Sequence, residues 1–276
     1  MLEPSKANKN MRIAIIGCGN MGLAFARSFL KYDLVKRDDL LLIEKSADRS
    51  SLLSSQNEGI VINTINEAIS AYDLVILAIK PQDFTAMALD LKNFLKEGQI
   101  VLSIMAGIPI KKIQHSLMHQ AVVRAMPNTP AMLGMGITGF TSAEGISIAK
   151  LFKVENLINA TGRSVYIENE SMLDAVTALS GSGPAYFYYF VKHMVDAGKQ
   201  MGFDESTALL FVKQTMLGAY HLINNAELDL DELIKAVASK GGTTEAALKV
   251  FGDRQLNQAI SEGILAAENR ARELSV

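Results

Sequence analysis

The sequence has little cysteine, little net charge and no long apolar run. Cys18 is the single cysteine in 276 residues, so no disulfide can form within the chain, which fits a reducing compartment such as the cytoplasm. The formal net charge of −2 gives no electrostatic reason to expect a nucleic-acid partner. No apolar run approaches the roughly 20 residues that span a bilayer. We therefore expect a cytoplasmic protein that binds a small molecule, with no nucleic-acid or membrane partner.

Length and composition favour two globular domains. Hydrophobic residues make up 49% of the chain and charged residues 20%. Residues 1–10 are polar and predict a loose N-terminal extension. Residues 11–163 alternate strand-length apolar runs with helical patterns, which predicts an α/β domain with a doubly wound, Rossmann-type sheet. Residues 164–276 are almost entirely helical in pattern, which predicts an all-helical domain.

Short apolar runs without polar alternation are typical of strands covered on both faces. The runs that predict strands are 12–17, 40–44, 59–63, 73–79, 99–105, 121–126 and 164–169. Helices are expected from Asn20 to about Lys31 and over 81–95, where Pro81 suits a first turn. Segment 182–201 is apolar on more than one face, so we expect it to be buried against its own domain and a second subunit.

The segment GCGNMG, residues 17–22, matches the glycine pattern of dinucleotide-binding turns. It follows a predicted strand and opens a predicted helix, which is the context that this pattern requires. Gly17 suits the tight turn, Gly19 the close approach of a pyrophosphate, and Gly22 the packing of the helix on the strand. Cys18, inside the loop, is interpreted as a small inert side chain rather than a nucleophile.

The residues after the second predicted strand leave the choice of cofactor open. Glu44 is placed to bind the ribose of NAD and to repel the 2′-phosphate of NADP. Lys45, Ser46 and Arg49, by contrast, are groups that bind such a phosphate. A solvated strand end is a third interpretation. We keep NAD(H) possible and favour NADP(H).

Four more segments, together with GCGNMG, resemble those of pyrroline-5-carboxylate reductases. They are AIKPQ (78–82), RAMPNTPA (124–131), ALSGSGPAYF (178–187) and SKGGTTEAAL (239–248), and the match runs in order from about residue 11 to 272. The resemblance implies reduction of L-1-pyrroline-5-carboxylate to L-proline with NAD(P)H, the last step of proline biosynthesis. It also implies a Rossmann domain and a helical domain through which two subunits interlock, with further assembly of dimers, for example into a decamer.

The resemblance also assigns roles residue by residue. The substrate is expected at SKGGTTEAAL, and Glu227 matches an acid near the ring nitrogen. Lys240 departs from the proline that many members have there, which leaves the stiffness of the loop in question. The resemblance places the cofactor at Gly17, Gly19, Asn20, Met21, Lys80, Pro81, Gln82, Ala106, Met126 and Asn128, and the substrate at Ser239, Gly241, Gly242, Thr243 and Thr244. The glycine pattern adds Gly22 to the expected cofactor residues, and their phosphate-binding groups add Lys45 and Ser46.

The residues of SKGGTTEAAL suit an anionic ligand on physical grounds as well. Gly241 and Gly242 can direct successive N–H groups into one concavity, and a helix that begins near Thr243 adds its positive end. Glu245 favours that helix start, and we expect a buried face at Ala247, Leu248 and Phe251. An ordinary helix–helix turn capped by glycine is the alternative.

Two residues are candidates for catalysis. Thr244 can hydrogen-bond the ring nitrogen of the imine, and Glu227 can stabilise the protonated imine through space or through water. Neither has the character of a strong general acid. We therefore expect the positioning of the two reacting rings to be the main catalytic effect.

Two other functions stay open at the level of sequence. A β-hydroxyacid-type NAD(P)-dependent dehydrogenase has a lysine four residues after the last glycine of a helix start, where this chain has Phe187. A non-catalytic nucleotide-sensing module needs no second anion site. No metal site is predicted, and His115 and His119, four residues apart on a predicted helix over 109–118, are expected to be a solvated pair.

Overall fold

The computed structural model describes residues 11–275, so the predicted extension over 1–10 lies outside the described residues. The chain divides into two compact units. The first runs up to Ser182 and also contains the end of the chain from Ala267, and the second runs from Gly183 to Ala266.

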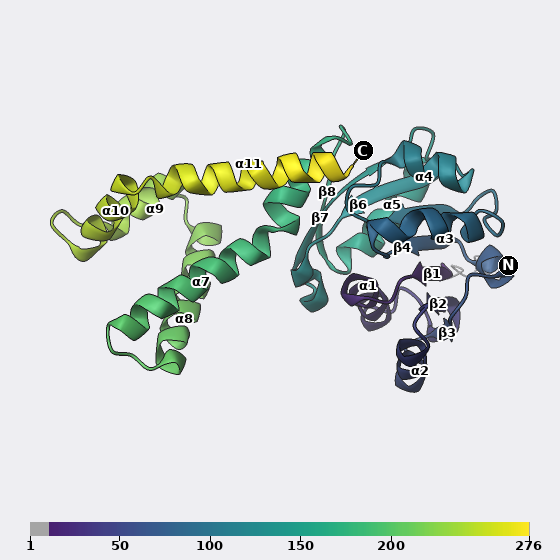
Figure 1. Cartoon of the computed structure of the whole chain (residues 1–276), viewed down its shortest axis with the longest axis horizontal. Coiled ribbons are helices and arrows are strands. Elements are labelled where there is room, and N and C mark those ends of the chain that lie inside the picture. The colour runs from purple at the N-terminus through teal and green to yellow at the C-terminus, as the bar shows by residue number, and fades with distance from the viewer. Residues whose placement is uncertain (1–10, 276) are drawn as a thin grey trace, which may run out of the picture. The chain divides into compact units, whose positions relative to one another are not determined.

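The first unit is built on one sheet (Figure 1). Within the described residues this sheet has eight strands, in the order β3-β2-β1-β4-β5-β6-β7-β8. Neighbouring strands are parallel except β6 and β7. The order 3-2-1-4-5-6 is that of a Rossmann fold, which confirms the predicted doubly wound sheet. The strands are β1 Ile13–Ile16, β2 Leu40–Ile43, β3 Ile60–Ile62, β4 Leu74–Leu77, β5 Ile100–Ser103, β6 Val122–Met126, β7 Gly136–Ser142 and β8 Gly162–Tyr166.

Helices cover both faces of this sheet. Successive residues of a strand point to opposite faces, so Ile13 and Ile15 of β1 join one core while Ala14 and Ile16 join the other. The first core is completed by α1 Asn20–Lys31, α2 Ala47–Gln56 and α5 Ile148–Asn159, and the second by α3 Phe84–Leu91 and α4 Ile110–Leu117. Burial on both faces explains why the strands are continuous apolar runs.

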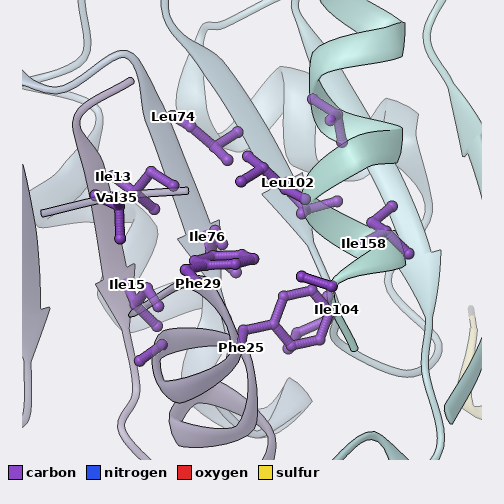
Figure 2. Packing of buried hydrophobic residues seen from close by; sticks show 14 of the residues in the cluster. Ile13, Ile15, Phe25, Phe29, Val35, Leu74, Ile76, Leu102, Ile104 and Ile158 are labelled. Carbon is purple, nitrogen blue, oxygen red and sulfur yellow. The ribbon is translucent and has the colours of Figure 1, made fainter. Parts of the chain in front are cut away.

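The core beneath α1 fixes that helix to the sheet. Phe25 and Phe29, both fully buried, meet edge to face with their ring centroids 5.8 Å apart. They lie among Ile76, Ile104 and Ile158 in the same cluster (Figure 2). Because edge-to-face aromatic pairs add to the stabilisation from burial alone, the position of α1, and of the loop at its start, is set by this packing.

The sequence patterns did not predict β7. Its sequence, GITGFTS, has glycines and threonines in place of an apolar run. Gly139 lies tightly against α6, because a Cβ there would lie 3.0 Å from side-chain atoms of Val176. Thr138 is fully buried although it is polar. Tertiary packing, rather than local pattern, makes this segment a strand.

The end of the sheet differs from the predicted domain boundary at residue 163. Strand β8 crosses that position and ends at Tyr166, and the division into compact units comes later, at Ser182. Helix α6, Met172–Val176, and a π-helical turn over Thr177–Gly181 lie between these two points.

A buried ion-pair network holds α6 within the first unit. Arg124 of β6, 4% exposed, has Nη1 3.0 Å from Oε1 of Glu170 and Nη2 3.4 Å from Oδ1 of Asp174. Glu170 also accepts the N–H of Ile110 at 2.8 Å, and Asp174 accepts the hydroxyl of Ser275 at 3.0 Å. The network thus joins β6, the start of α4, α6 and the end of the chain.

The second unit contains helices and no strand among the described residues. Gly198 of α7 packs so closely on α8 that a Cβ there would lie 2.9 Å from the Cβ of Ala208. None of the described helices is both long and apolar enough to cross a membrane. The helices are α7 Gly183–Gln200, α8 Glu205–Asn225, α9 Leu230–Val237, α10 Thr243–Asp253 and α11 Leu256–Leu274, the last of which ends in the first unit.

Large apolar side chains of the second unit face solvent in the single chain. On α7, expected to be buried, Phe187, Tyr188 and Tyr189 are 63%, 67% and 63% exposed. No residue of α10 is buried, so the buried face predicted at Ala247, Leu248 and Phe251 is wrong for the single chain. Exposed apolar surface of this extent marks an interaction surface.

Replacing Arg124 with methionine should destabilise the first unit. The change leaves Asp174 buried without its cation, so we expect the free energy of unfolding in urea to fall by about 3–5 kcal/mol. Arg270→Met is the matched control, because its ion pair with Glu273 is exposed and such pairs contribute little. Equal stability of the two variants would show that the network does not hold α6.

Candidate functional site

The predicted cofactor residues gather at one edge of the sheet. Strands β1, β2, β4, β5 and β6 are parallel, so the residues that follow them lie at the same edge. The strand order reverses between β1 and β4, and ligands of such sheets bind at that reversal. Of the predicted cofactor residues, Gly17, Lys45, Lys80, Ala106 and Asn128 each lie shortly beyond the end of one of these strands, in strand order.

The three glycines of the first glycine loop, residues 17–22, differ in what surrounds them. Gly17 has φ +97°, and a Cβ there would lie 2.7 Å from the carbonyl oxygen of Ala78. A Cβ at Gly22 would lie 2.1 Å from the carbonyl oxygen of Gly17, so α1 starts directly against the turn. Beside Gly19, by contrast, the space is open to 4 Å in the described part of the chain. The loop therefore fits a dinucleotide, with room for the pyrophosphate beside Gly19.

The start of α1 offers donors to an anion. Gly19 is its N-cap and supplies no side-chain hydrogen bond. Asn20 and Met21 form the first turn. The first N–H groups of a helix have no partner within the helix and carry its positive end, which favours a phosphate at this position.

Two further groups of predicted cofactor residues flank this loop along the sheet edge. Lys80 precedes a 3-10 turn over Pro81–Asp83, and the side chains of Lys80 and Gln82 are exposed. The helix predicted over 81–95 is thus a 3-10 turn followed by the shorter α3. After β2, Lys45 and Ser46 are exposed, and the hydroxyl of Ser46 caps α2 by accepting the N–H of Arg49 at 3.5 Å.

The side chains after β5 and β6 are packed rather than free. Nδ2 of Asn128 donates to the hydroxyl of Ser180 at 3.2 Å, and Oδ1 accepts the N–H of Ile137 at 3.1 Å. A Cβ at Gly181 would lie 2.7 Å from Cε of Met126. Asn128 therefore fixes the chain after β6 in place, and Ala106 and Met126, both half-buried, provide apolar surface at the same edge.

Cys18 and His119 are buried titratable side chains of the first unit. Burial, with a smaller contribution from the Glu44 carboxylate, raises the pKa of the Cys18 thiol to about 12, which agrees with its interpretation as inert. His119 is buried beyond the end of α4, with Nε2 3.0 Å from the carbonyl oxygen of Gln99, and burial lowers its pKa. The predicted solvated pair is therefore wrong at His119. Among the described residues, His, Cys, Asp and Glu form no metal-binding cluster.

The second glycine loop, residues 239–244, joins α9 to α10, and the helix begins at Thr243 as predicted. Gly241 has φ +73°. Its N–H donates to Oε2 of Glu245 at 2.6 Å, and the N–H of Gly242 donates to the carbonyl of Ser239 at 2.9 Å. Both N–H groups predicted to form the concavity are thus already bonded, that of Gly241 to a side chain of α10 and that of Gly242 within the loop. The donors that follow, on Thr243 and Thr244, belong to the first turn of α10 and have no partner within the helix.

The side chains assigned to the substrate differ in burial. Thr244 is half-buried, whereas Ser239 and Thr243 are exposed. Glu227 is exposed between α8 and α9, and its side chain makes no hydrogen bond or ion pair with the described residues. The roles of Thr244 and Glu227 stay predictions.

The fold and the first glycine loop define a Rossmann-type NAD(P)-dependent oxidoreductase with an added helical domain. The family model described as pyrroline-5-carboxylate reductase dimerisation matches residues 170–274. A model described as NADP oxidoreductase, coenzyme F420-dependent, matches residues 12–107. The helical region is thus the dimerisation domain that the sequence resemblance implies.

Relatives of known name match nearly the whole chain. The pyrroline-5-carboxylate reductase of Pseudomonas aeruginosa is 35% identical over 96% of this chain and 97% of that protein, and that of Haemophilus influenzae is 34% identical over 95% and 97%. The solved structure of the Coxiella burnetii pyrroline-5-carboxylate reductase superposes with a TM-score of 0.87 at 30% identity, over 97% of this chain and 100% of that one. This chain belongs to the pyrroline-5-carboxylate reductase family. The resemblance is confirmed, and neither alternative function is favoured.

Gly19→Ala should weaken cofactor binding without weakening the fold. The added methyl group enters open space, where we place the pyrophosphate. We expect NADPH affinity, measured by fluorescence titration, to fall at least about tenfold, or about 1.4 kcal/mol, while Tm is unchanged. Gly17→Ala is the control, because its clash with Ala78 and its positive φ should lower Tm. Wild-type NADPH affinity in Gly19→Ala would contradict the placement of the pyrophosphate.

Proposed function

We propose that this protein reduces L-1-pyrroline-5-carboxylate to L-proline, the last step of proline biosynthesis, with NADPH preferred over NADH. The observation that carries this proposal is the presence of two glycine-rich helix starts in one member of the family. One is open beside Gly19, and the other begins a helix at Thr243. The first suits a pyrophosphate and the second suits a small carboxylate.

The first glycine loop and the strand ends beside it hold the dinucleotide. The N–H groups at the start of α1 bind the pyrophosphate. Lys80, Pro81, Gln82, Ala106, Met126 and Asn128 orient the nicotinamide half, and the hydrogen bonds of Asn128 to Ser180 and Ile137 keep this edge in a fixed shape. When bound, the reduced nicotinamide supplies the hydride that adds to the imine carbon.

The second glycine loop holds the substrate by its carboxylate. The N–H groups of Thr243 and Thr244 donate to the carboxylate, and the bond from Gly241 to Glu245 keeps the loop in shape. The hydroxyl of Thr244 donates a hydrogen bond to the neutral ring nitrogen, and it accepts one from the N–H of the protonated imine. Glu227 stabilises the protonated imine. The proton itself comes from solvent, so these residues act mainly by positioning and electrostatics.

The exposed apolar helices of the second unit support a homodimer. A second copy of the dimerisation domain covers such surface, in keeping with the family model that matches it. Assembly beyond a dimer, such as a decamer, stays a prediction.

The cytoplasmic location also stays a prediction, and it rests on the single cysteine.

The direct test is to mix the purified protein with pyrroline-5-carboxylate and either NADPH or NADH, and to follow the absorbance of the reduced cofactor together with the formation of proline. We expect turnover with both cofactors and a higher kcat/KM with NADPH. Cofactor binding without turnover, for both cofactors, would contradict the proposal.

Thr244→Ala should impair turnover without abolishing it. It removes one hydrogen bond to a charged substrate, so we expect kcat/KM for the imine to fall about 10- to 100-fold. Thr244→Ser keeps the hydroxyl and should stay near wild type. Wild-type kcat/KM in the alanine variant would show that the role assigned to Thr244 is wrong.

A further inference from the structure

Arg49, in the first turn of α2, connects the first glycine loop to the end of β2. Its Nη2 atom donates to the carbonyl of Cys18 and lies 3.6 Å from Oε2 of Glu44. The side chain is 52% exposed, and a guanidinium carries five N–H donors. An arginine is thus held at the sheet edge with donors left for a ligand.

Glu44 has both carboxylate oxygens engaged. The residue is 8% exposed. Oε1 accepts the N–H of Ser46 at 3.0 Å, and Oε2 faces Arg49. An acid at this position in NAD-binding sheets hydrogen-bonds the ribose and disfavours a 2′-phosphate by charge repulsion. Here its charge is offset by a neighbouring cation.

The charge balance at this strand end depends on Arg49. Between residues 44 and 49, Lys45 and Arg49 balance Glu44 and Asp48. Removing Arg49 leaves one net negative charge beside the predicted adenosine ribose, because the hydroxyl of Ser46 caps α2 and adds no charge.

We infer that Arg49 determines the preference for NADPH, by neutralising Glu44 and by binding the 2′-phosphate with its remaining donors. Arg49 has this role only if the first glycine loop binds the dinucleotide, as the proposed function requires. Glu44 alone would make this an NAD-type site, and Arg49 converts it into an NADP-type site. The pairing of Glu44 with Arg49 explains why the sequence after β2 has both an acid typical of NAD sites and a basic residue typical of NADP sites.

Binding of nucleotide fragments to the full-length protein tests this role without turnover. Adenosine 2′,5′-bisphosphate and 5′-AMP differ only in the 2′-phosphate, and calorimetric titration gives the affinity for each. We expect wild type to prefer the bisphosphate. Arg49→Ala should lower bisphosphate affinity about 10- to 100-fold, the range for a lost hydrogen bond between charged groups, with little change for 5′-AMP. Adding Glu44→Gln should recover part of the loss.

Arg27→Ala is the matched control, because Arg27 is 50% exposed and pairs with Glu58 at 2.8 Å. We expect it to leave both affinities unchanged. A wild type without preference for the bisphosphate, an Arg49→Ala variant with unchanged preference, or equal losses for both nucleotides would overturn the inference. Preference through Arg49 in a protein that fails to reduce pyrroline-5-carboxylate would support the inference and contradict only the proposed function.

Discussion

The turn from β1 into α1 depends on Gly17 and Gly22, which let the start of α1 lie directly against the turn and the turn lie directly against Ala78. Any side chain at Gly22 would collide with the carbonyl of Gly17, and Gly17 itself needs a positive φ beside Ala78. Phe25 and Phe29 then fix α1 on the sheet. The start of this helix, with its uncapped N–H groups, therefore has a fixed position beside the open space at Gly19. The placement of a dinucleotide follows from these steric facts more than from any single polar side chain.

The second glycine loop uses the same helix-end physics with different donors. Glu245 and the carbonyl of Ser239 occupy the N–H groups of the two glycines. The next free N–H groups are therefore those of Thr243 and Thr244, where we propose that the substrate binds. The unit that carries this loop leaves its large apolar residues exposed in the single chain. Covering this surface in the dimer that we propose would stabilise the unit that carries the second glycine loop.

Much of the fold could be predicted from the sequence because apolar runs covered on both faces are a strong local signal. Strand β7 could not, because its glycine and threonine residues form a strand only where Val176 and its neighbours pack against them. The buried face expected at Leu248 and Phe251 is absent from the single chain, because the helical pattern shows which apolar residues share a face and not what covers that face. His119 was misjudged because α4 ends at Leu117, so helical spacing does not apply to it.

The sequence indicates which candidate residues gather at the strand ends, but not which hydrogen bonds and ion pairs they make. Strand ends place Lys80, Ala106 and Asn128 at one edge, and parallel topology alone explains this. The side-chain rotamer of Glu245, which decides which N–H groups are free, carries no signal in the sequence. The contact between Arg49 and Glu44 also carries no signal in the sequence. In this contact the arginine offsets the charge of the glutamate.

We propose that hydride passes from a cofactor at the first glycine loop to an imine held at the second. The most direct measurement is mass spectrometry of proline formed from pyrroline-5-carboxylate and NADPH dideuterated at the reactive nicotinamide carbon. We expect proline with one deuterium on the former imine carbon. Unlabelled proline, or no proline from a protein that binds NADPH, would contradict it.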